Sequence, residues 1–513
     1  MIANNNQITG IIDIGSNTVR LSVYRLSDNG AYRVIDQGRW AARLSQRMTA
    51  EGALPDDAID ELAEVLRRYL LICDKHGAGN VRAVATAAVR QAINRDVVIA
   101  KLREATGLSI EILSGEDEAR IGSKAMLNSL HYTDGYIVDI GGGSTEITLI
   151  RDRKVVSAVS FPIGCVNVSA KFGLGSGPVS PSTLADIQSE ARRLLRKEKW
   201  ISEHADLPLI GLGGTVRAMA KLYQQESGYP YHRLHGYELQ LDGILSSLEL
   251  LSSISVNQRR KLPGLSKDRG DVIVPGLAIL IAVMQETRSS RLVVCGTGLR
   301  DGLFYETCLP EHNAVSGNDV LEESISNLMA LYPGAPLGHL EQVRRLAATL
   351  YDQLEEKTAM PKAGRIWLDA AARLFRIGTV IDFNDCADHT FYMLLHTQWN
   401  GLSHRETIIT AAIASYRGGN PLKRKLAPYR SILAEEDAET IGKLGSLLQL
   451  ASALDRSESQ AIVSLGIGHS GKRLQLVAAA THPLPVERME VEKIAKEFKK
   501  NWGITPELTV RIG

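Results

Sequence analysis

Two segments with the same residue pattern constrain the fold of this chain more than any other feature. An apolar run ends in Asp139, turns through Gly141-Gly142-Gly143-Ser144 and resumes at Thr145-Glu146 as a second apolar run. Near the N-terminus an apolar run likewise ends in Asp13, and turns through Gly15-Ser16-Asn17-Thr18 into another. Glycines permit a tight turn whose N–H groups can approach an anion. The repeat predicts a duplicated hairpin that holds one phosphate-rich ligand from two sides.

The pattern of apolar residues changes once along the chain. Up to about residue 312, strand-like runs alternate with helix-like periods, and beyond it almost everything is helical by period until short strand-like runs return after residue 460. Because 513 residues exceed one compact core, we expect several domains. The predicted domains are 1–132, 133–312, 313–458 and 459–513.

The expected elements follow from period and turn residues. The predicted strands are 8–14, 18–26, 31–37, 81–85, 109–113, 136–140, 145–150, 155–161, 207–212, 292–295, 461–465 and 473–479. The predicted helices are 56–73, 96–105, 184–198, 274–284, 320–331, 340–355, 365–378, 405–416, 438–454 and 487–500. Asn94 is expected to cap the helix at 96–105, and 296–302 is expected to be the exit of a strand.

Composition excludes several functional classes. The net charge of +1 gives no overall argument for a nucleic-acid or membrane partner, so an anionic substrate must be met by local clusters. The five cysteines include no Cys-x-x-Cys pair, which argues against a zinc site or a disulfide framework. No stretch of eighteen apolar residues occurs. We therefore expect a cytoplasmic protein with no membrane anchor.

Further residues point to phosphate chemistry. A strand breaks at Gly213-Gly214-Thr215 into a helix, and a helix N-terminus of this kind can bind an anion. Arg90 follows another strand end and, with Arg20, can meet a phosphate charge. Asp and Glu beside the glycine turns supply the oxygen ligands that Mg²⁺ prefers. No Walker A lysine loop occurs. The alternative is that Gly141-Gly142-Gly143 is only a tight hairpin.

The acidic segment Ser114-Gly115-Glu116-Asp117-Glu118 has two interpretations. One is a helix cap, with Ser114 at the N-cap and carboxylates stabilised by the helix dipole. The other is that one carboxylate enters the site as a general base. Both can hold for different side chains of the same turn.

Six motifs in order resemble the exopolyphosphatase / guanosine pentaphosphate phosphohydrolase (Ppx/GppA) family over residues 8–307. They begin at Asp13, Ala85, Ser114, Asp139, Gly213 and Pro275. The resemblance implies two ribonuclease-H-like α/β domains of the actin, sugar kinase and Hsp70 superfamily around a cleft. A mainly α-helical HD-like domain and a small α+β subdomain would follow them.

The resemblance also implies roles for individual residues. Glu118 would be the catalytic carboxylate that activates water. Asp139 and Glu146 would hold Mg²⁺ with Gly141 nearby, while Asp13 would meet the metal or only shape its loop. Arg20 receives no shared role. The implied phosphate-binding residues are Ser16, Asn17, Thr18, Arg90, Gly142, Gly143, Ser144, Gly213, Gly214 and Thr215.

The helical C-terminal part resembles an HD-like domain that lacks its metal ligands. Phe375 and Arg376 stand where the family of HD phosphohydrolases needs His and Asp, and neither is a metal ligand. His339 and Asp455 would be remnants of the outer ligands, so the domain is expected to be catalytically silent. Basic residues around Lys423-Arg424-Lys425 would either guide a polyanion or form an ordinary solvated face.

The leading hypothesis is an exopolyphosphatase, a phosphoric anhydride hydrolase that releases terminal orthophosphate from inorganic polyphosphate. The alternatives are a guanosine pentaphosphate 5′-phosphohydrolase, a non-catalytic sensor of guanosine alarmones, and an ATP-dependent kinase or ATPase of the same superfamily. The resemblance also implies a homodimer.

Overall fold

The computed structural model describes residues 7–310, 316–355 and 360–512, which form two compact units that divide between Val320 and Leu321. The expected domain boundary at 312/313 lies outside the described residues. In the described part of the chain, no helix combines the length and apolarity that crossing a membrane requires.

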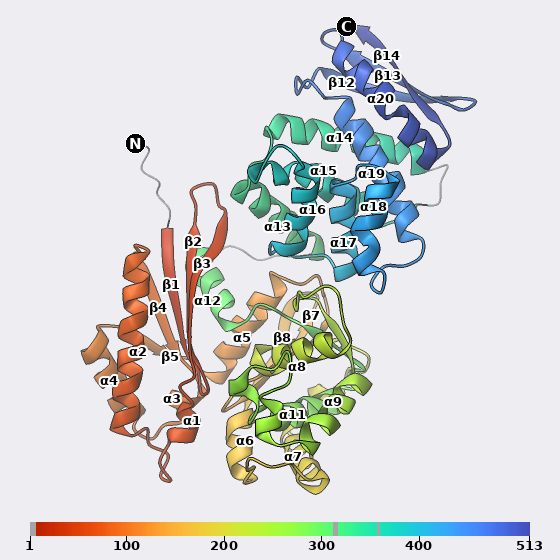
Figure 1. Ribbon diagram of the computed structural model, residues 1–513. Helices are drawn as coiled ribbons and strands as arrows, with labels where there is room; N and C mark the ends of the chain where they lie inside the picture. The colour runs from red at the N-terminus through yellow and green to blue at the C-terminus, as the bar shows by residue number, and fades with distance from the viewer. Residues whose placement is uncertain (1–6, 311–315, 356–359, 513) are drawn as a thin grey trace. The chain divides into compact units, whose positions relative to one another are not determined.

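The first unit begins with a five-stranded sheet in the order β3-β2-β1-β4-β5 (Figure 1). Its strands are β1 (Gln7–Ile14), β2 (Val19–Leu26), β3 (Tyr32–Trp40), β4 (Asn80–Ala85) and β5 (Ile110–Ile112). β1 and β2 form an antiparallel hairpin, whereas β4 lies parallel to β1 and β5 parallel to β4. The carboxyl ends of β1 and β4 therefore lie at the same edge.

The second sheet repeats this order and adds β10 at one edge, giving β10-β11-β9-β6-β7-β8. Its strands are β6 (Gly135–Ile140), β7 (Thr145–Arg151), β8 (Lys154–Phe161), β9 (Leu209–Leu212), β10 (Glu238–Gln240) and β11 (Arg291–Val294). β6 and β7 are an antiparallel hairpin, and β9 lies parallel to β6. The duplicated ribonuclease-H-like arrangement is confirmed.

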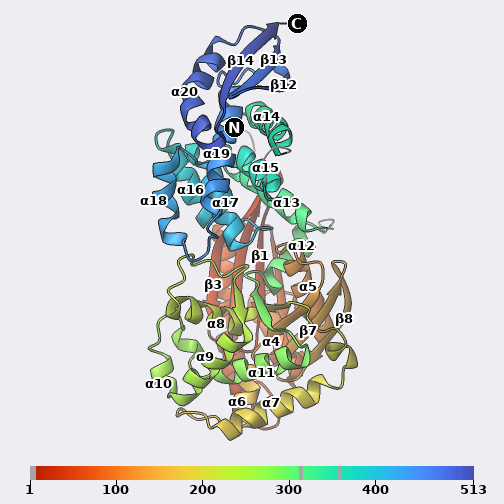
Figure 2. The same cartoon turned by 90° about the vertical axis from the view of Figure 1, so that its right-hand side faces the viewer.

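Helices cover both faces of each sheet. Those up to residue 308 are α1 (Leu44–Arg47), α2 (Asp56–Lys75), α3 (Ala87–Gln91), α4 (Arg95–Thr106), α5 (Gly115–Leu127), α6 (Cys165–Lys171), α7 (Pro181–Leu195), α8 (Gly213–Glu226), α9 (Leu241–Ser253), α10 (Val256–Arg259), α11 (Ile273–Glu286) and α12 (Leu299–Cys308). α11 is buried along Ile273 to Met284 in the core of the second sheet, beside α7 (Figure 2).

Alternate residues of the first sheet point to opposite faces. Ile12 and Leu21 pack in one core with α2 and α4. Ile11 and Tyr24 pack in another with α5 and α12, where the rings of Tyr24 and Phe304 stack with centroids 4.2 Å apart. α12 follows β11, the last strand of the second sheet along the chain, and yet it packs on the first sheet.

The second unit is helical with a small sheet. The helices from residue 317 onward are α13 (Gly317–Leu331), α14 (Leu337–Glu355), α15 (Gly364–Leu374), α16 (Cys386–His396), α17 (His404–Ala414), α18 (Gly419–Leu426), α19 (Asp437–Ala453) and α20 (Pro485–Trp502). The sheet has the order β12-β13-β14, from β12 (Ile462–Ser470), β13 (Arg473–Ala480) and β14 (Thr505–Ile512), and α20 packs along it (Figure 2).

Two expectations about local structure are wrong. Asn94 precedes α4, but its side chain makes no hydrogen bond that caps the helix. The side-chain amide instead accepts from Leu54 N at 3.0 Å and donates to Leu54 O at 2.8 Å. It does so because one amide group can satisfy both a backbone donor and a backbone acceptor. The helix expected over 365–378 ends at Leu374 and is followed by a separate 3₁₀ turn, Ile377–Val380. The segment 296–302 follows the end of β11 as expected, and α12 begins within it.

Candidate active site

The two glycine turns have the same geometry and touch each other. Gly15 N donates to Thr18 O at 3.2 Å, and Gly141 N donates to Ser144 O at 2.9 Å. A Cβ on Gly142 would lie 3.0 Å from Ser16 Cβ, and one on Gly143 would lie 2.8 Å from Ser16 Oγ. Contacts this close leave little room for a side chain, which favours glycine where the turns meet.

These turns line a cavity of about 130 Å³ between the two sheets. Twelve of the expected site residues line it: Asp13, Ser16, Asn17, Thr18, Glu118, Asp139, Gly141, Gly142, Ser144, Glu146, Gly213 and Gly214. Gly143 packs against Ser16 instead, and Thr215 is buried with its hydroxyl donating to Ile140 O at 3.3 Å. Arg90 contacts the site through Glu118.

Asn17 carries an unused donor in this cavity. Its side chain is 7% exposed, and Nδ2 has no hydrogen-bond partner among the described residues. A buried amide donor without a partner is costly unless a ligand satisfies it. An anionic oxygen in the cavity would do so.

Glu118 lies on the first turns of α5 and faces the cavity. Arg90 Nη1 donates to Glu118 Oε2 at 3.0 Å and to Leu113 O at 2.8 Å. Burial raises the pKa of Glu118 well above its ordinary value and the charge of Glu146 raises it further, while Arg90 opposes both. A carboxyl group with a raised pKa beside a water-accessible cavity is suited to act as a general base.

The capping interpretation of this turn is confirmed. Ser114 is the N-cap of α5, and its Oγ accepts from Asp117 N at 3.0 Å. A Cβ on Gly115 would lie 2.3 Å from Ser160 Cβ, so the N-terminus of α5 packs directly on β8. The cap and this close packing place Glu118 one turn further along, at the cavity.

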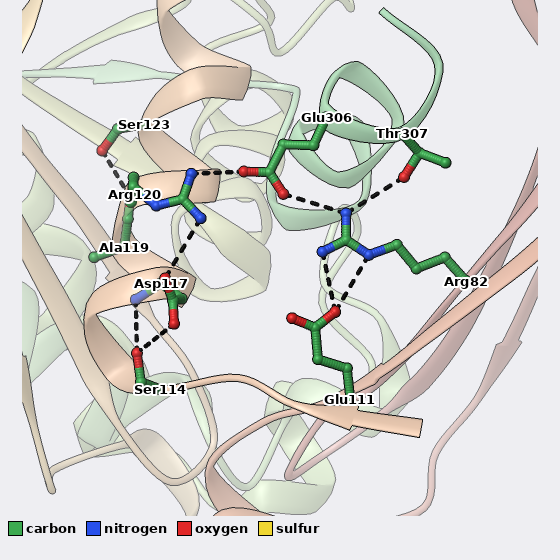
Figure 3. A network of polar contacts seen from close by, with 9 residues as sticks. All are labelled: Arg82, Glu111, Ser114, Asp117, Ala119, Arg120, Ser123, Glu306 and Thr307. Carbon is green, nitrogen blue, oxygen red and sulfur yellow. Dashed lines mark hydrogen bonds and ion pairs between the residues drawn. The ribbon is translucent and has the colours of Figure 1, made fainter. Parts of the chain in front are cut away.

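Polar contacts fix α5 to the neighbouring elements (Figure 3). Glu306 on α12 accepts from Arg120 Nη1 at 2.6 Å through one oxygen and from Arg82 Nη1 at 3.2 Å through the other. Arg82 on β4 also donates to Glu111 Oε2 on β5 at 3.0 Å. Because α5 is tied to α12 and α12 to the first sheet, the helix that carries Glu118 has little freedom to shift.

Asp139 and Glu146 face each other across the β6–β7 ladder. Burial raises the pKa of Asp139 to about 6 and that of Glu146 to about 7, and each group also feels a neighbouring carboxylate. The pKa of Asp13 is raised by burial too, while Arg300 and Arg20 lower it. Repulsion of this kind is relieved by a bound cation.

The donor set fits Mg²⁺ that shares its coordination shell with phosphate and water. Mg²⁺ is usually held by one or two carboxylates plus substrate phosphates. Among the described residues, no group of three or more His, Cys, Asp or Glu is arranged to bind a metal without further ligands. The carbonyl of Gly141, an expected neighbour of the metal, accepts from Cys165 N at 3.0 Å.

Four arginines complete the cavity, and of these the sequence pointed only to Arg20 as a phosphate-binding candidate. Arg20, Arg217, Arg269 and Arg300 all line it. Burial lowers the pKa of Arg20 to about 9, and the charges of Arg217 and Arg300 contribute to the shift. Cations that destabilise one another in a buried space favour an anionic ligand. Arg217 and Arg300 lie in the glycine-containing segments 211–217 and 296–302. The nearby glycines could have identified both arginines in the sequence as candidate site residues.

Arg269 had no such signal in the sequence. It is 7% exposed and lies against the third glycine turn, where a Cβ on Gly214 would be 1.9 Å from its Nη2. A Cβ on Gly213, whose φ is +79°, would be 2.1 Å from Asp139 Oδ1. The two glycines therefore allow a carboxylate and a guanidinium to approach the same turn.

Comparisons with known proteins agree with this geometry. The family model described as the Ppx/GppA phosphatase family matches residues 22–311, and that described as Ppx/GppA phosphatase, domain III, matches residues 320–497. A solved Aquifex aeolicus member of the Ppx/GppA protein family has 28% sequence identity and a TM-score of 0.52, and the match covers 60% of this chain and 100% of that one.

A solved structure described as an exopolyphosphatase from Cytophaga hutchinsonii has 22% identity and a TM-score of 0.56, with the same coverage of 60% and 100%. This likeness shows a common fold. Since the first family model spans more than half of the sequence and a second matches most of the rest, the chain belongs to the Ppx/GppA phosphatase family.

Proposed function

We propose that this protein is an exopolyphosphatase, which removes the terminal phosphate of inorganic polyphosphate with Glu118 as the general base. The observation that carries the proposal is the position of Glu118: its pKa is raised, Arg90 orients it, and it faces a cavity lined by glycine turns and arginines.

In the proposed reaction Glu118 accepts a proton from a water molecule, whose oxygen attacks the terminal phosphorus. The P–O bond to the next phosphate breaks, and the shortened chain leaves with the negative charge on its oxygen. Asn17 Nδ2 and the N–H groups of the turns donate to phosphate oxygens, and the four arginines balance charge on the chain. Mg²⁺ bound by Asp139 and Glu146, with Asp13 near, would neutralise equatorial phosphate oxygens.

The lining of the cavity favours a polyphosphate over a nucleotide. Among the described residues that line it there is no aromatic side chain on which a guanine could stack. A cavity that recognises phosphate charge and has no surface for a nucleobase suits a chain made only of phosphates. The guanosine pentaphosphate alternative is tested by comparing kcat/KM for long-chain polyphosphate and for the nucleotide in parallel; higher kcat/KM for the nucleotide would reverse the assignment.

The role of Glu118 is tested by Glu118→Gln, which keeps the shape of the side chain and removes the base. We expect phosphate release from polyphosphate to fall by a factor of about 10²–10⁴. Glu116→Gln is the matched control, because Glu116 is an exposed glutamate two residues away on the same helix. Wild-type turnover in Glu118→Gln would remove Glu118 from this role, and loss of turnover in both variants would point to a change in α5 instead.

We also propose, following the family resemblance, that the protein works as a homodimer in the cytoplasm. Size-exclusion chromatography with light scattering measures the first point directly. The catalytic silence and HD-like character of the helical domain stay predictions.

A further inference from the structure

A second and larger cavity, of about 860 Å³, lies entirely within the C-terminal unit. Residues from α14, α16, α17, α18, α19 and α20 line it. Its volume is in the range of pockets that hold small organic ligands, and exceeds what a single phosphate or sulfate ion fills. It is built independently of the residues assigned to the hydrolytic reaction.

The buried His339 in the wall of this cavity has an unused nitrogen. The side chain is 2% exposed, Nδ1 is 2.8 Å from Asp455 Oδ2, and Nε2 has no hydrogen-bond partner among the described residues. The carboxylate accepts from Nδ1, so Nε2 can accept from a ligand in the neutral ring or donate to a phosphate oxygen in the protonated ring. Either way, a ligand in the cavity would satisfy it.

The charges that line the cavity are partly paired and leave an excess of guanidinium groups. Arg376 pairs with Glu458 at 3.4 Å, Lys425 with Asp388 at 2.9 Å, and Glu490 with Lys493 at 3.5 Å. Asp385 is a further carboxylate in the wall. Arg417, Arg424 and Arg456 line the cavity and make no ion pair in the described part of the chain. Three unpaired guanidiniums suit phosphate oxygens, which they bind bidentately.

Lys425, which the sequence analysis grouped with Arg424, has a structural role. Its Nζ also donates to Ser415 O at 3.1 Å and to Ala387 O at 3.4 Å, so it joins α16, α17 and α18. Of the two basic residues of this segment that line the cavity, only Arg424 is therefore without an ion pair among the described residues.

Aromatic and apolar surface makes up another part of the wall. Phe375 lies with its ring centroid 5.8 Å from that of His339, and Phe383 is 69% exposed beneath the guanidinium of Arg376, at 5.8 Å. Tyr416, Leu448 and Ile494 line the cavity as well. A planar ring system could stack on or pack against these groups.

We propose that this cavity binds a small phosphate ester that carries an aromatic ring, of the nucleoside di- or triphosphate class. Arg417, Arg424 and Arg456 contact its phosphates, the ring packs near Phe375 and Phe383, and His339 Nε2 hydrogen bonds to it. The site is separate from the phosphate cavity of the first unit and does not depend on the proposed hydrolytic activity.

The test uses the full-length protein and N-methylanthraniloyl-GDP, with binding followed by fluorescence anisotropy. We expect saturable binding that weakens at least about tenfold in Arg417→Ala/Arg456→Ala, because two charge-assisted contacts are lost. The matched control, Arg430→Ala/Arg488→Ala, removes two exposed arginines outside the cavity wall and should bind as the wild type does. Ser452→Phe fills the cavity without changing charge and should also weaken binding.

Asn17→Ala separates the two sites, since it alters the first unit only and should leave binding of the probe unchanged. Competition with the fluorescent probe distinguishes the ligand chemistry. GDP should displace the probe most strongly, sodium tripolyphosphate should displace it more weakly, and guanosine should displace it least. Absence of saturable binding to the wild type, or wild-type binding in both the double arginine variant and Ser452→Phe, would overturn the proposal. Competition by tripolyphosphate as strong as by GDP would overturn the assignment to a ring-bearing ligand.

Discussion

Replacing Glu146 by Gln should stabilise the protein while it abolishes hydrolysis. Glu146 is 4% exposed, and burial raises its pKa from 4.5 to about 7, with the charge of Asp139 adding to the shift. Above pH 7 the native protein therefore holds a carboxylate that the unfolded chain would solvate far better. Glutamine has nearly the same shape and no charge to bury, and it can still accept the bond that Ser160 Oγ donates at 2.7 Å.

The size of the effect follows from the pKa shift. At about 1.4 kcal/mol per pKa unit, a shift from 4.5 to about 7 corresponds to on the order of 3 kcal/mol at pH 8. The sign follows from proton binding: between pH 4.5 and 7 the native state holds more protons than the unfolded state, so stability falls as pH rises. At pH 5 the native carboxyl is already protonated, and the penalty shrinks to about 1 kcal/mol or less.

The assay is thermal unfolding of wild type and Glu146→Gln at pH 5 and pH 8, without added metal. We expect the melting temperature of the variant to exceed that of the wild type by on the order of 5 °C at pH 8, and the difference to narrow at pH 5. Glu116→Gln, an exposed change, should show no difference at either pH. Added Mg²⁺ should raise the melting temperature of the wild type more than that of Glu146→Gln, because the cation relieves the same repulsion.

Two results would refute this reasoning. One is a Glu146→Gln variant that is no more stable than the wild type at pH 8. The other is a gain of equal size at pH 5 and pH 8, since a change in packing would not depend on pH. Phosphate release should fall by orders of magnitude in either case if Glu146 helps to hold the metal.

Two more predictions concern the support of Glu118. Arg90→Ala should move the acid limb of the pH profile of kcat/KM to higher pH, because burial and Glu146 then raise the pKa of Glu118 unopposed. Arg90→Lys keeps the positive charge and should keep the acid limb near its wild-type position. An acid limb that does not move in Arg90→Ala would contradict the link between Arg90 and the pKa of Glu118. Gly302→Ala should lower the unfolding free energy by about 1–3 kcal/mol in denaturant titrations, because the added Cβ would lie 2.1 Å from Ile121 O. Gly79→Ala is the control, because the space around its Cβ is open. Equal stability of the two variants would argue against tight packing of α12 on α5.

Local sequence patterns predicted most strands of the first unit and several helices of both units. The turns after Asp13 and Asp139 depend on glycines within a few residues, so the duplicated hairpin could be read from the chain itself. Strand and helix periods are local as well, which explains why α2, α11 and α19 fall close to their expected bounds. The assignment of Glu118 as the base came from a resemblance, since spacing alone favoured a helix cap for this turn.

Contacts between distant residues could not be predicted in this way. Arg269 enters the phosphate cavity by packing on Gly214, and its own neighbours in sequence give no sign of it. Asn94 has the residue type and position of a helix cap, yet Leu54 offers it both a donor and an acceptor. The C-terminal cavity likewise brings His339 together with side chains more than a hundred residues further along the chain, such as Arg456.

The packing of α12 on the first sheet has a consequence for biosynthesis. The strands of that sheet are complete once Ile112 has been made, but the helix that covers Ile11 and Tyr24 begins only at Leu299. While the ribosome adds the intervening residues, this apolar face can pack with α5 but lacks α12. The nascent chain thus exposes an aggregation-prone surface until α12 emerges, and a fragment ended before Leu299 would keep that surface permanently.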